Sequence, residues 1–93
     1  MELSKKCIIR IHLRRYINDH IHRNSLYLTE IRKHQMQNAF IQHLQIHEIL
    51  ETEEEIAETR LLTIQFLNQH QNLQDRYGIA FLKREAESKT FTD

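Results

Sequence analysis

Apolar side chains recur at intervals of three and four residues along most of this chain. The clearest series forms one predicted helix face, and its members are Ile56, Thr59, Thr63, Phe66, His70, Leu73 and Tyr77. A period near 3.6 residues places such side chains on one side of an α-helix. The chain has no proline and a single glycine, Gly78, so it lacks the turn residues that a strand-rich domain needs. The pattern therefore predicts an all-α fold.

The predicted architecture is a three-helix bundle with a short helix after it. The expected helices cover about 5–22, 26–50, 53–77 and 79–87. Asn24 or Ser25 is the expected cap of the second helix, with Thr29 as an alternative, because these side chains accept hydrogen bonds from free helix amides. Thr52 and Glu55 form a capping-box pattern at the start of the third helix. One helical domain is expected over 1–88, followed by a polar tail at 89–93.

Two features of this assignment stay open at the level of sequence. The stretch CIIRIHLRR, residues 7–15, alternates like a strand but also places Arg10 and Arg14 one turn apart on a helix. We favour the helix, because a lone strand has nothing to pair with in a helical chain. In addition, residues 30–77 could form one continuous rod, although charges at two positions of its core argue against a coiled coil.

The charge of the chain is zero in total but unevenly distributed. Residues 1–23 carry six lysines and arginines against two acids, whereas acidic residues crowd between 48 and 58. Such a chain can dock an acidic protein through its N-terminal third. Nucleic acid is a less suitable partner, because the whole-chain field is neutral and the basic residues are not interleaved with stacking aromatics.

The length and hydropathy of the chain also point to a protein partner. Ninety-three residues can form one core near the lower limit for stability, and a mean hydropathy of −0.64 leaves wide polar faces. No run of about 18 apolar residues is present, so no transmembrane segment is expected. The single cysteine, Cys7, cannot form an internal disulfide and fits a reducing compartment.

The strongest candidates for partner binding are basic residues beside aliphatic ones. Arg10 and Arg14 share a helix face next to apolar side chains, and Arg32 with Lys33 follows on the next helix. Guanidinium groups form paired hydrogen bonds with carboxylates or phosphate. We therefore expect these four residues to contact an acidic surface.

Candidate chemistry is sparse. His43 and His47 lie one turn apart and are the best-placed pair for a transition metal, but no third ligand is evident, and the expectation is that no metal is bound. Nothing places Cys7 in a nucleophile arrangement, and one glycine is too few for a phosphate-binding loop. The chain is therefore expected not to be an enzyme.

The pattern resembles the mitochondrial LYR-motif family of small three-helix proteins. That family opens with Leu-Tyr-Arg and a second arginine four residues later. The corresponding residues here are Ile-Ile-Arg at 8–10 and Leu-Arg at 13–14, with Ile9 at the place of the tyrosine. The second helix of the family carries an Ile/Val-Arg pair, then an aromatic residue and an aliphatic residue. The corresponding residues here are 31–32, Met36 at the place of the aromatic, and Ile41.

This resemblance implies a non-catalytic assembly factor or accessory subunit of a mitochondrial complex, located in the matrix or otherwise in the cytoplasm. Many members bind the acidic acyl carrier protein. Its acidic helix would meet Arg10, Arg14 and Arg32, and an acyl chain on the partner's phosphopantetheine would enter between the helices; the chain itself would hold no cofactor. We call the candidate lining residues the apolar slot: Ile9, Leu13, Met36, Phe40, Phe66 and Leu67.

A second interpretation is an unrelated helical protein of bacterial or phage type. Such a protein would self-associate, or cap a target protein, through the faces that carry Phe40, Phe66 and Tyr77. A homo-oligomer is therefore the alternative to an adaptor.

Overall fold

The structure, a computed structural model, describes residues 4–88 as four α-helices and one π-helical turn. The elements are α1 (Lys5–Ile17), the π-helical turn η1 (Asn18–His22), α2 (Glu30–Ile46), α3 (Glu53–Tyr77) and α4 (Ile79–Ser88). Between residues 4 and 88 there is no strand, which confirms the all-α prediction. The polar tail expected at 89–93 lies outside the described residues.

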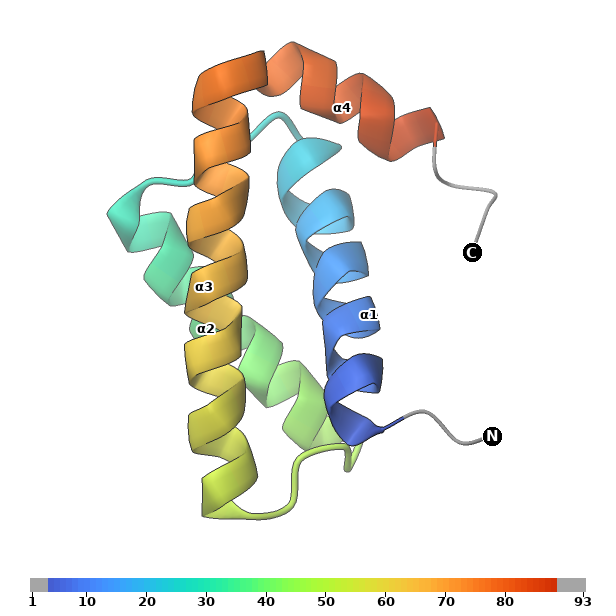
Figure 1. Ribbon diagram of the computed structural model, residues 1–93, viewed down its shortest axis with the longest axis vertical. Helices are drawn as coiled ribbons and strands as arrows, with labels where there is room; N and C mark the ends of the chain where they lie inside the picture. The colour runs from blue at the N-terminus through green and yellow to red at the C-terminus, as the bar shows by residue number, and fades with distance from the viewer. Residues whose placement is uncertain (1–3, 89–93) are drawn as a thin grey trace.

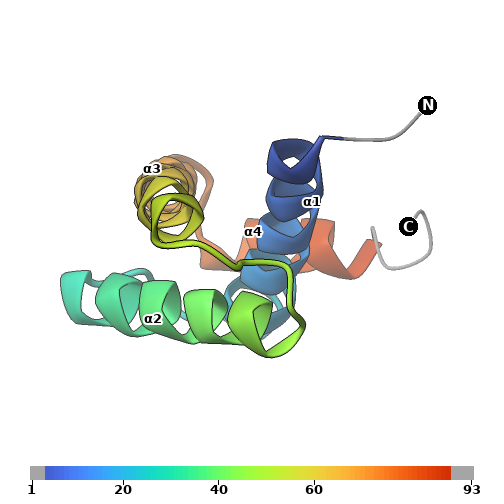
Figure 2. The same cartoon turned by 90° about the horizontal axis from the view of Figure 1, so that it is seen from below.

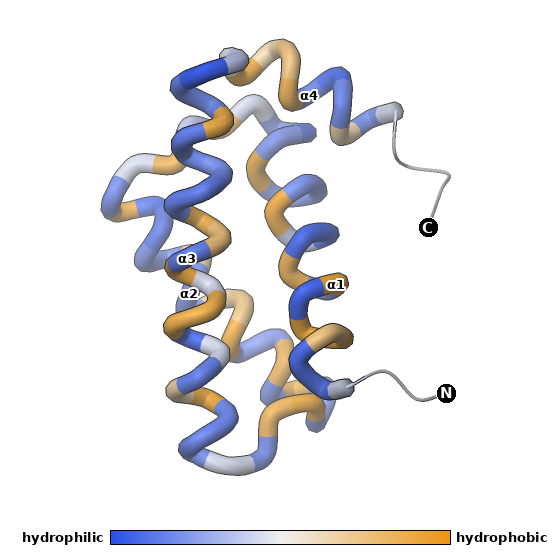
Figure 3. Tube along the Cα trace, in the orientation of Figure 1, coloured by the Kyte–Doolittle hydropathy of each residue, from blue (hydrophilic) through white to orange (hydrophobic). Residues whose placement is uncertain are grey.

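Two of the long helices lie side by side and the third crosses them. Figure 1 shows α1 and α3 running in the same direction, with α2 passing diagonally behind them. Viewed along α1 and α3, α2 lies crosswise on one side of the layer that these two helices form (Figure 2). The short α4 turns away from the end of α3 and packs on η1. Along every helix, apolar residues recur between polar ones (Figure 3). This is the pattern of a helix that buries one face.

The ambiguous stretch at residues 7–15 is helical, as expected. Ser4 caps α1 by accepting a hydrogen bond from the amide of Cys7 at 3.2 Å. The buried side chains of α1 are Ile9, Leu13 and Ile17, which are the positions that a helical period selects. Together α1 and η1 cover the predicted range 5–22, and the last turn is π-helical rather than α-helical.

The second helix begins later than predicted, because α3 binds the backbone of residues 26–28, which is not helical. The side-chain amide of Gln74, which is 4 % exposed, accepts from the Leu28 amide and donates to the Leu26 carbonyl, each at 2.8 Å. These two bonds hold the backbone around Leu28 against α3. The cap is Thr29, the alternative candidate, whose hydroxyl accepts from the Arg32 amide at 3.1 Å.

α2 also ends earlier than predicted, at Ile46, and a tight turn follows. The Ile49 amide donates to the Leu44 carbonyl at 2.9 Å, and the Glu48 amide donates to the Gln45 carbonyl at 3.0 Å. This is the Schellman arrangement, which places one residue in the left-handed region. That residue is Glu48, with φ of 59°. Residues 30–77 are therefore two helices and not one rod.

The bounds of the third helix agree with the prediction. Thr52 and Glu55 form the expected capping box, with the hydroxyl and the carboxylate each accepting a backbone amide. Gly78 ends the helix with φ of 89° and ψ of 155°, a backbone conformation that residues other than glycine rarely adopt. The chain turns there into α4, at the place predicted for the fourth helix.

One apolar core joins α1, α2 and α3. Its completely enclosed side chains include Leu13, Phe40 and Leu67, one from each helix. None of the helices in the described residues is long and apolar enough to cross a membrane.

The predicted face of α3 is confirmed only in part: Thr59 and Thr63 are buried, whereas Tyr77 is 51 % exposed. The buried Leu62 and Leu67 lie outside the series.

Replacing Glu48 with glycine should stabilise the fold. Glycine enters the left-handed region without the steric cost that a Cβ adds, so we expect Glu48→Gly to raise the free energy of unfolding by about 1 kcal/mol. Urea denaturation measures this change. Gln42→Gly, in the exposed interior of α2, should instead lower stability by about 1 kcal/mol. Equal losses in both variants would show that the turn does not impose the left-handed conformation.

Candidate functional site: a basic groove between α1 and α3

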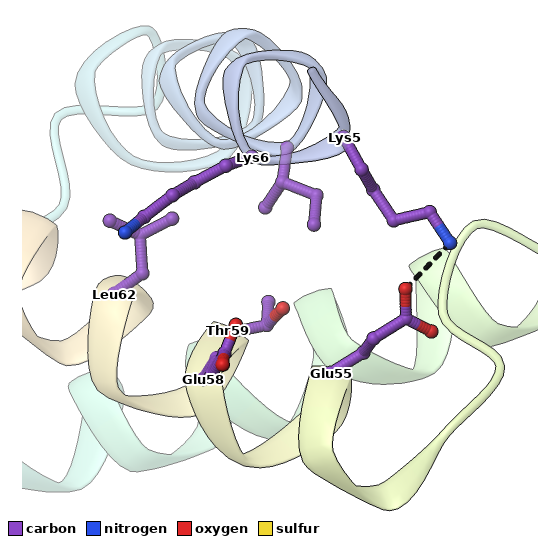
Figure 4. Close-up of a pocket in the computed structure, with 7 residues that line it drawn as sticks. Lys5, Lys6, Glu55, Glu58, Thr59 and Leu62 are labelled. Carbon is purple, nitrogen blue, oxygen red and sulfur yellow. Dashed lines mark hydrogen bonds and ion pairs between the residues drawn. The ribbon is translucent and has the colours of Figure 1, made fainter.

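A cleft of about 110 Å³ opens between the first turns of α1 and α3. Its lining residues are Lys5, Lys6, Ile9, Glu55, Glu58, Thr59 and Leu62. Ile9, Thr59 and Leu62 are buried, while the lysines and Glu58 are exposed. Figure 4 shows Lys5 turned toward Glu55 and Lys6 extending toward Leu62. The cleft therefore combines buried side chains with a charged rim.

The Lys5–Glu55 ion pair bridges α1 and α3 at one end of this cleft. The Lys5 Nζ lies 2.7 Å from the Glu55 carboxylate. The same carboxylate accepts the amides of Glu51 and Thr52, at 3.0 and 3.1 Å, as part of the capping box. The hydrogen bond from Lys5, together with these two amides, lowers the pKa of Glu55 to about 2. Glu55 thus joins the start of α3 to the start of α1.

The cleft continues along the two helices. Lys6, Glu58 and Leu62 also line the next hollow, together with Arg10, Leu61 and Gln65. One turn further, the guanidinium of Arg14 stands 6.0 Å from the centre of the Phe66 ring, a cation–π contact. We call this continuous surface the basic groove; its cationic residues are Lys6, Arg10 and Arg14, and its apolar residues are Leu61, Leu62 and Phe66.

The cations of the basic groove are available to a partner. Lys6, Arg10 and Arg14 are exposed, and within residues 4–88 none of them forms an ion pair. They repeat every four residues and so project from one side of α1. Arg10 and Arg14 were singled out by the sequence pattern. Lys6 completes the same spacing, but only its position beside Leu62 shows that it belongs to the groove.

The other two basic candidates lie elsewhere and serve the fold. Arg32, on α2, donates to the carbonyl of Tyr27 and so supports the loop before α2. Lys33 is only 3 % exposed, and its ammonium reaches Asn68 at 2.9 Å and Gln71 at 2.7 Å on α3. Glu30 adds an ion pair at 2.8 Å. The interior position of Lys33 therefore excludes it from an exposed binding surface.

The apolar slot residues form the core itself. Ile9, Leu13, Met36, Phe40 and Leu67 all belong to one buried cluster, against which the half-buried Phe66 packs. Leu13, Phe40 and Leu67 have no exposed surface. An acyl chain would therefore have to part the helices before it could lie among these side chains.

The metal candidates His43 and His47 belong to a wider group of aromatic rings. Their ring centres are 4.5 Å apart, and His43 also lies 5.9 Å from the ring of Tyr16 on α1. Burial, followed by the proximity of His47, His12 and His20, lowers the pKa of His43. Among the residues described, no three or more histidine, cysteine or acidic side chains are arranged to hold a metal ion.

A hydrogen bond between the buried His22 and the half-buried His70 is a feature that the sequence does not reveal. His22 on η1 and His70 on α3 are hydrogen bonded through Nε2 and Nδ1 at 2.9 Å. The two residues are 48 positions apart, so no local spacing connects them. A His-x-His pattern at 20–22 is visible in the sequence, but it does not indicate which histidine is buried.

The Lys5–Glu55 pair should make stability sensitive to acid. Because the pKa of Glu55 is lowered from 4.5 to about 2, its ionised form stabilises the fold above pH 4.5, and this contribution is lost as the pH falls toward 2. Glu55→Gln keeps a capping side chain but removes the charge. The difference in unfolding free energy between the parent protein and this variant should shrink over that range in urea denaturation.

Glu54→Gln is the matched control, because Glu54 is an exposed acid in the same first turn of α3. It should show a much smaller change over the same pH range. A parent-to-Glu55→Gln difference that stayed constant from pH 6 to pH 2 would contradict the role given to the ion pair.

Comparison with known proteins does not assign this chain to a family. No family model matches the sequence, and no match was found among curated proteins or solved structures. The resemblance to the LYR-motif family therefore remains a prediction from the residues at 8–14 and 31–41. Function has to be inferred from the chemistry of the basic groove.

Proposed function

We propose that this protein is a non-catalytic helical adaptor that binds an acidic partner protein through the basic groove. The observation that carries the proposal is the row of cations Lys6, Arg10 and Arg14 beside exposed apolar surface. A cation that stabilises the fold is expected to be paired with an acid of the same chain, as Lys5 is with Glu55. These three are unpaired within the described chain and remain free to attract a partner.

The spacing of the row fits a helix of opposite charge. Eight residues of α-helix extend about 12 Å, so Lys6 and Arg14 stand about that far apart along α1. A partner helix with acidic side chains one turn apart presents carboxylates at the same interval. Arginine favours such a contact, because its planar guanidinium can donate two parallel hydrogen bonds to one carboxylate.

The apolar part of the groove would add affinity that charge alone does not supply. Leu61 is 60 % exposed, so a partner that meets the charged row can cover it. Phe66 is half-buried and already holds Arg14 over its ring. A partner covering these side chains would remove apolar surface from water, and the excluded water would strengthen the charge contacts.

An acyl carrier protein of a mitochondrial assembly is the partner class that we propose, by way of the LYR resemblance. Its acidic helix matches the charge of the groove. The contact would rest on Arg10, Arg14 and Lys6, since Arg32 supports Tyr27 and Lys33 is buried. Because the apolar slot is closed, entry of an acyl chain would be a second step after the charged surfaces meet.

Reversing two charges of the groove should abolish binding. Titration calorimetry with purified acyl carrier protein should show at least a tenfold loss of affinity for Arg10→Glu/Arg14→Glu, because two attractive contacts become repulsive. Helicity by circular dichroism should not change, since both side chains are exposed. The affinity of the parent protein should also fall with added salt, as expected for exposed charges.

Lys83→Glu/Arg84→Glu provides a control with the same change in net charge on exposed positions of α4. It should bind like the parent protein. An equal loss of affinity in both variants would show that only the net charge matters and not the basic groove. If the parent protein does not bind acyl carrier protein, this partner is rejected. A clean homodimer with no affinity for acidic proteins would favour the self-associating alternative.

The acyl chain can be tested separately by comparing the holo and acylated forms of the carrier. Tighter binding of the acylated form is expected, because each buried methylene contributes roughly 0.8 kcal/mol. Equal affinity of the two forms would confine the contact to the groove and exclude entry into the apolar slot.

A further inference from the structure

The hydrogen bond between His22 and His70 joins the end of η1 to α3. His22 is 2 % exposed, and His70 is half-buried. The His22 Nε2 and the His70 Nδ1 are 2.9 Å apart. The other ring nitrogen of His22, Nδ1, is buried and has no hydrogen-bond partner among residues 4–88. His22 therefore has one hydrogen-bonded nitrogen, Nε2, and one nitrogen, Nδ1, at which a proton would have no acceptor among residues 4–88.

Each neutral ring carries one N–H, and only one proton fits between the two bonded nitrogens, Nε2 of His22 and Nδ1 of His70. A hydrogen bond between two ring nitrogens needs one N–H and one lone pair. With the proton on His22 Nε2, the buried Nδ1 is a bare lone pair. With the proton on His70 Nδ1, neutral His22 must carry its own proton on Nδ1, which leaves a buried donor unsatisfied. The first tautomer is therefore favoured, because an orphaned buried donor is the rarer and costlier arrangement.

An additional proton, which makes one of the two rings cationic, is costly wherever it binds. Cationic His22 carries an N–H on its buried Nδ1, which has no acceptor in the described chain. Cationic His70 carries an N–H on Nδ1, which either meets the N–H of His22 or forces that proton onto the orphaned nitrogen. Burial accordingly lowers the pKa of His22 below its usual value of 6.5.

Among residues 4–88, no acidic side chain forms an ion pair or a hydrogen bond with His22 that would compensate an additional proton. On its own turn, Asp19 is paired with Arg23 at 3.1 Å. From α3 the facing group is His70 itself. The helix α4 packs on η1, and its buried side chains are Leu82 and Ala86. The charged side chains of α4 are all exposed, and they are Lys83, Arg84, Glu85 and Glu87.

We propose that the His22–His70 pair is an acid-sensitive latch, in which an additional proton on either ring breaks the hydrogen bond and loosens η1 from α3. The bond is a direct side-chain link between η1 and α3, so its loss frees the last turn of the first helical segment. α4 rests on η1 and loses part of its support with it. This inference is independent of the proposed partner, because the latch uses no residue of the basic groove.

The direction of the pH effect follows from the lowered pKa. The neutral pair stabilises the closed latch above pH 6.5, and this stability is lost as the pH falls below that value toward the pKa of His22 in the fold. One proton gained on opening raises the opening equilibrium constant by up to about tenfold per pH unit.

Amide hydrogen exchange, corrected for the intrinsic effect of pH on the exchange rate, measures this opening. We expect the opening constant of residues 18–29 to rise between pH 7.5 and pH 5.5 in the parent protein, with little change in the first half of α3. In His22→Leu the same segment should open equally at both pH values, because the titrating group is gone. Unchanged protection in the parent, or a parent-like pH effect in His22→Leu, would overturn the latch.

His34→Leu is the matched control, since His34 is an exposed histidine on α2. It should keep the pH effect of the parent protein. Nitrogen NMR of the histidine rings tests the latch without any substitution, in case His22→Leu does not fold. His22 should carry its proton on Nε2 and titrate below 6.5; a proton on Nδ1, or titration at or above 6.5, would contradict the proposal.

Discussion

The structure depends on the enclosure of Leu13, Phe40 and Leu67 by one another and by their neighbours. These three side chains come from three different helices, and none has exposed surface. A chain of 93 residues can enclose little more than one such cluster, so each helix must turn its apolar side toward the same place. The direction in which every other side chain points follows from this shared constraint.

One consequence is that polar groups near the core have to be satisfied by specific partners. Lys33 is held by Asn68 and Gln71 on α3, and Gln74 holds the chain at 26–28 through two backbone hydrogen bonds. Each arrangement satisfies groups that would be costly to bury alone. Both connect α3 to α2 or to the loop before it, so they fix where α2 begins and how it crosses α3. The buried imidazole of His22 follows the same rule, but within residues 4–88 only its Nε2 has a hydrogen-bond partner.

A second consequence concerns where function can reside. The residues that a carrier-binding protein would need for an acyl chain are the ones this chain uses to fold. The proposed function places recognition on the rim between α1 and α3, where Lys6, Arg10 and Arg14 stand beside Leu61. Exposed charges of this kind attract a partner and orient it, while the covered apolar area holds it. The basic groove is therefore suited to surface recognition, and entry into the core needs a rearrangement.

The sequence determined the features that depend on near neighbours in the chain. Period and composition identified the helical class, and the Thr52 capping box and Gly78 located both ends of α3. The spacing of Arg10 and Arg14 identified one side of the candidate site, because residues four apart on a helix always share a face. These features are local, since the partners that define them lie within a few residues.

Only the tertiary structure decided the features that join distant parts of the chain. It moved the start of α2 to Glu30 through Gln74, buried Lys33, and brought His22 to His70 across 48 positions. It also placed Lys6 and Leu62 on one groove. No periodicity encodes such contacts, because they depend on how helices cross around the shared core, and the free energy of enclosing that core outweighs the local preference of any single residue.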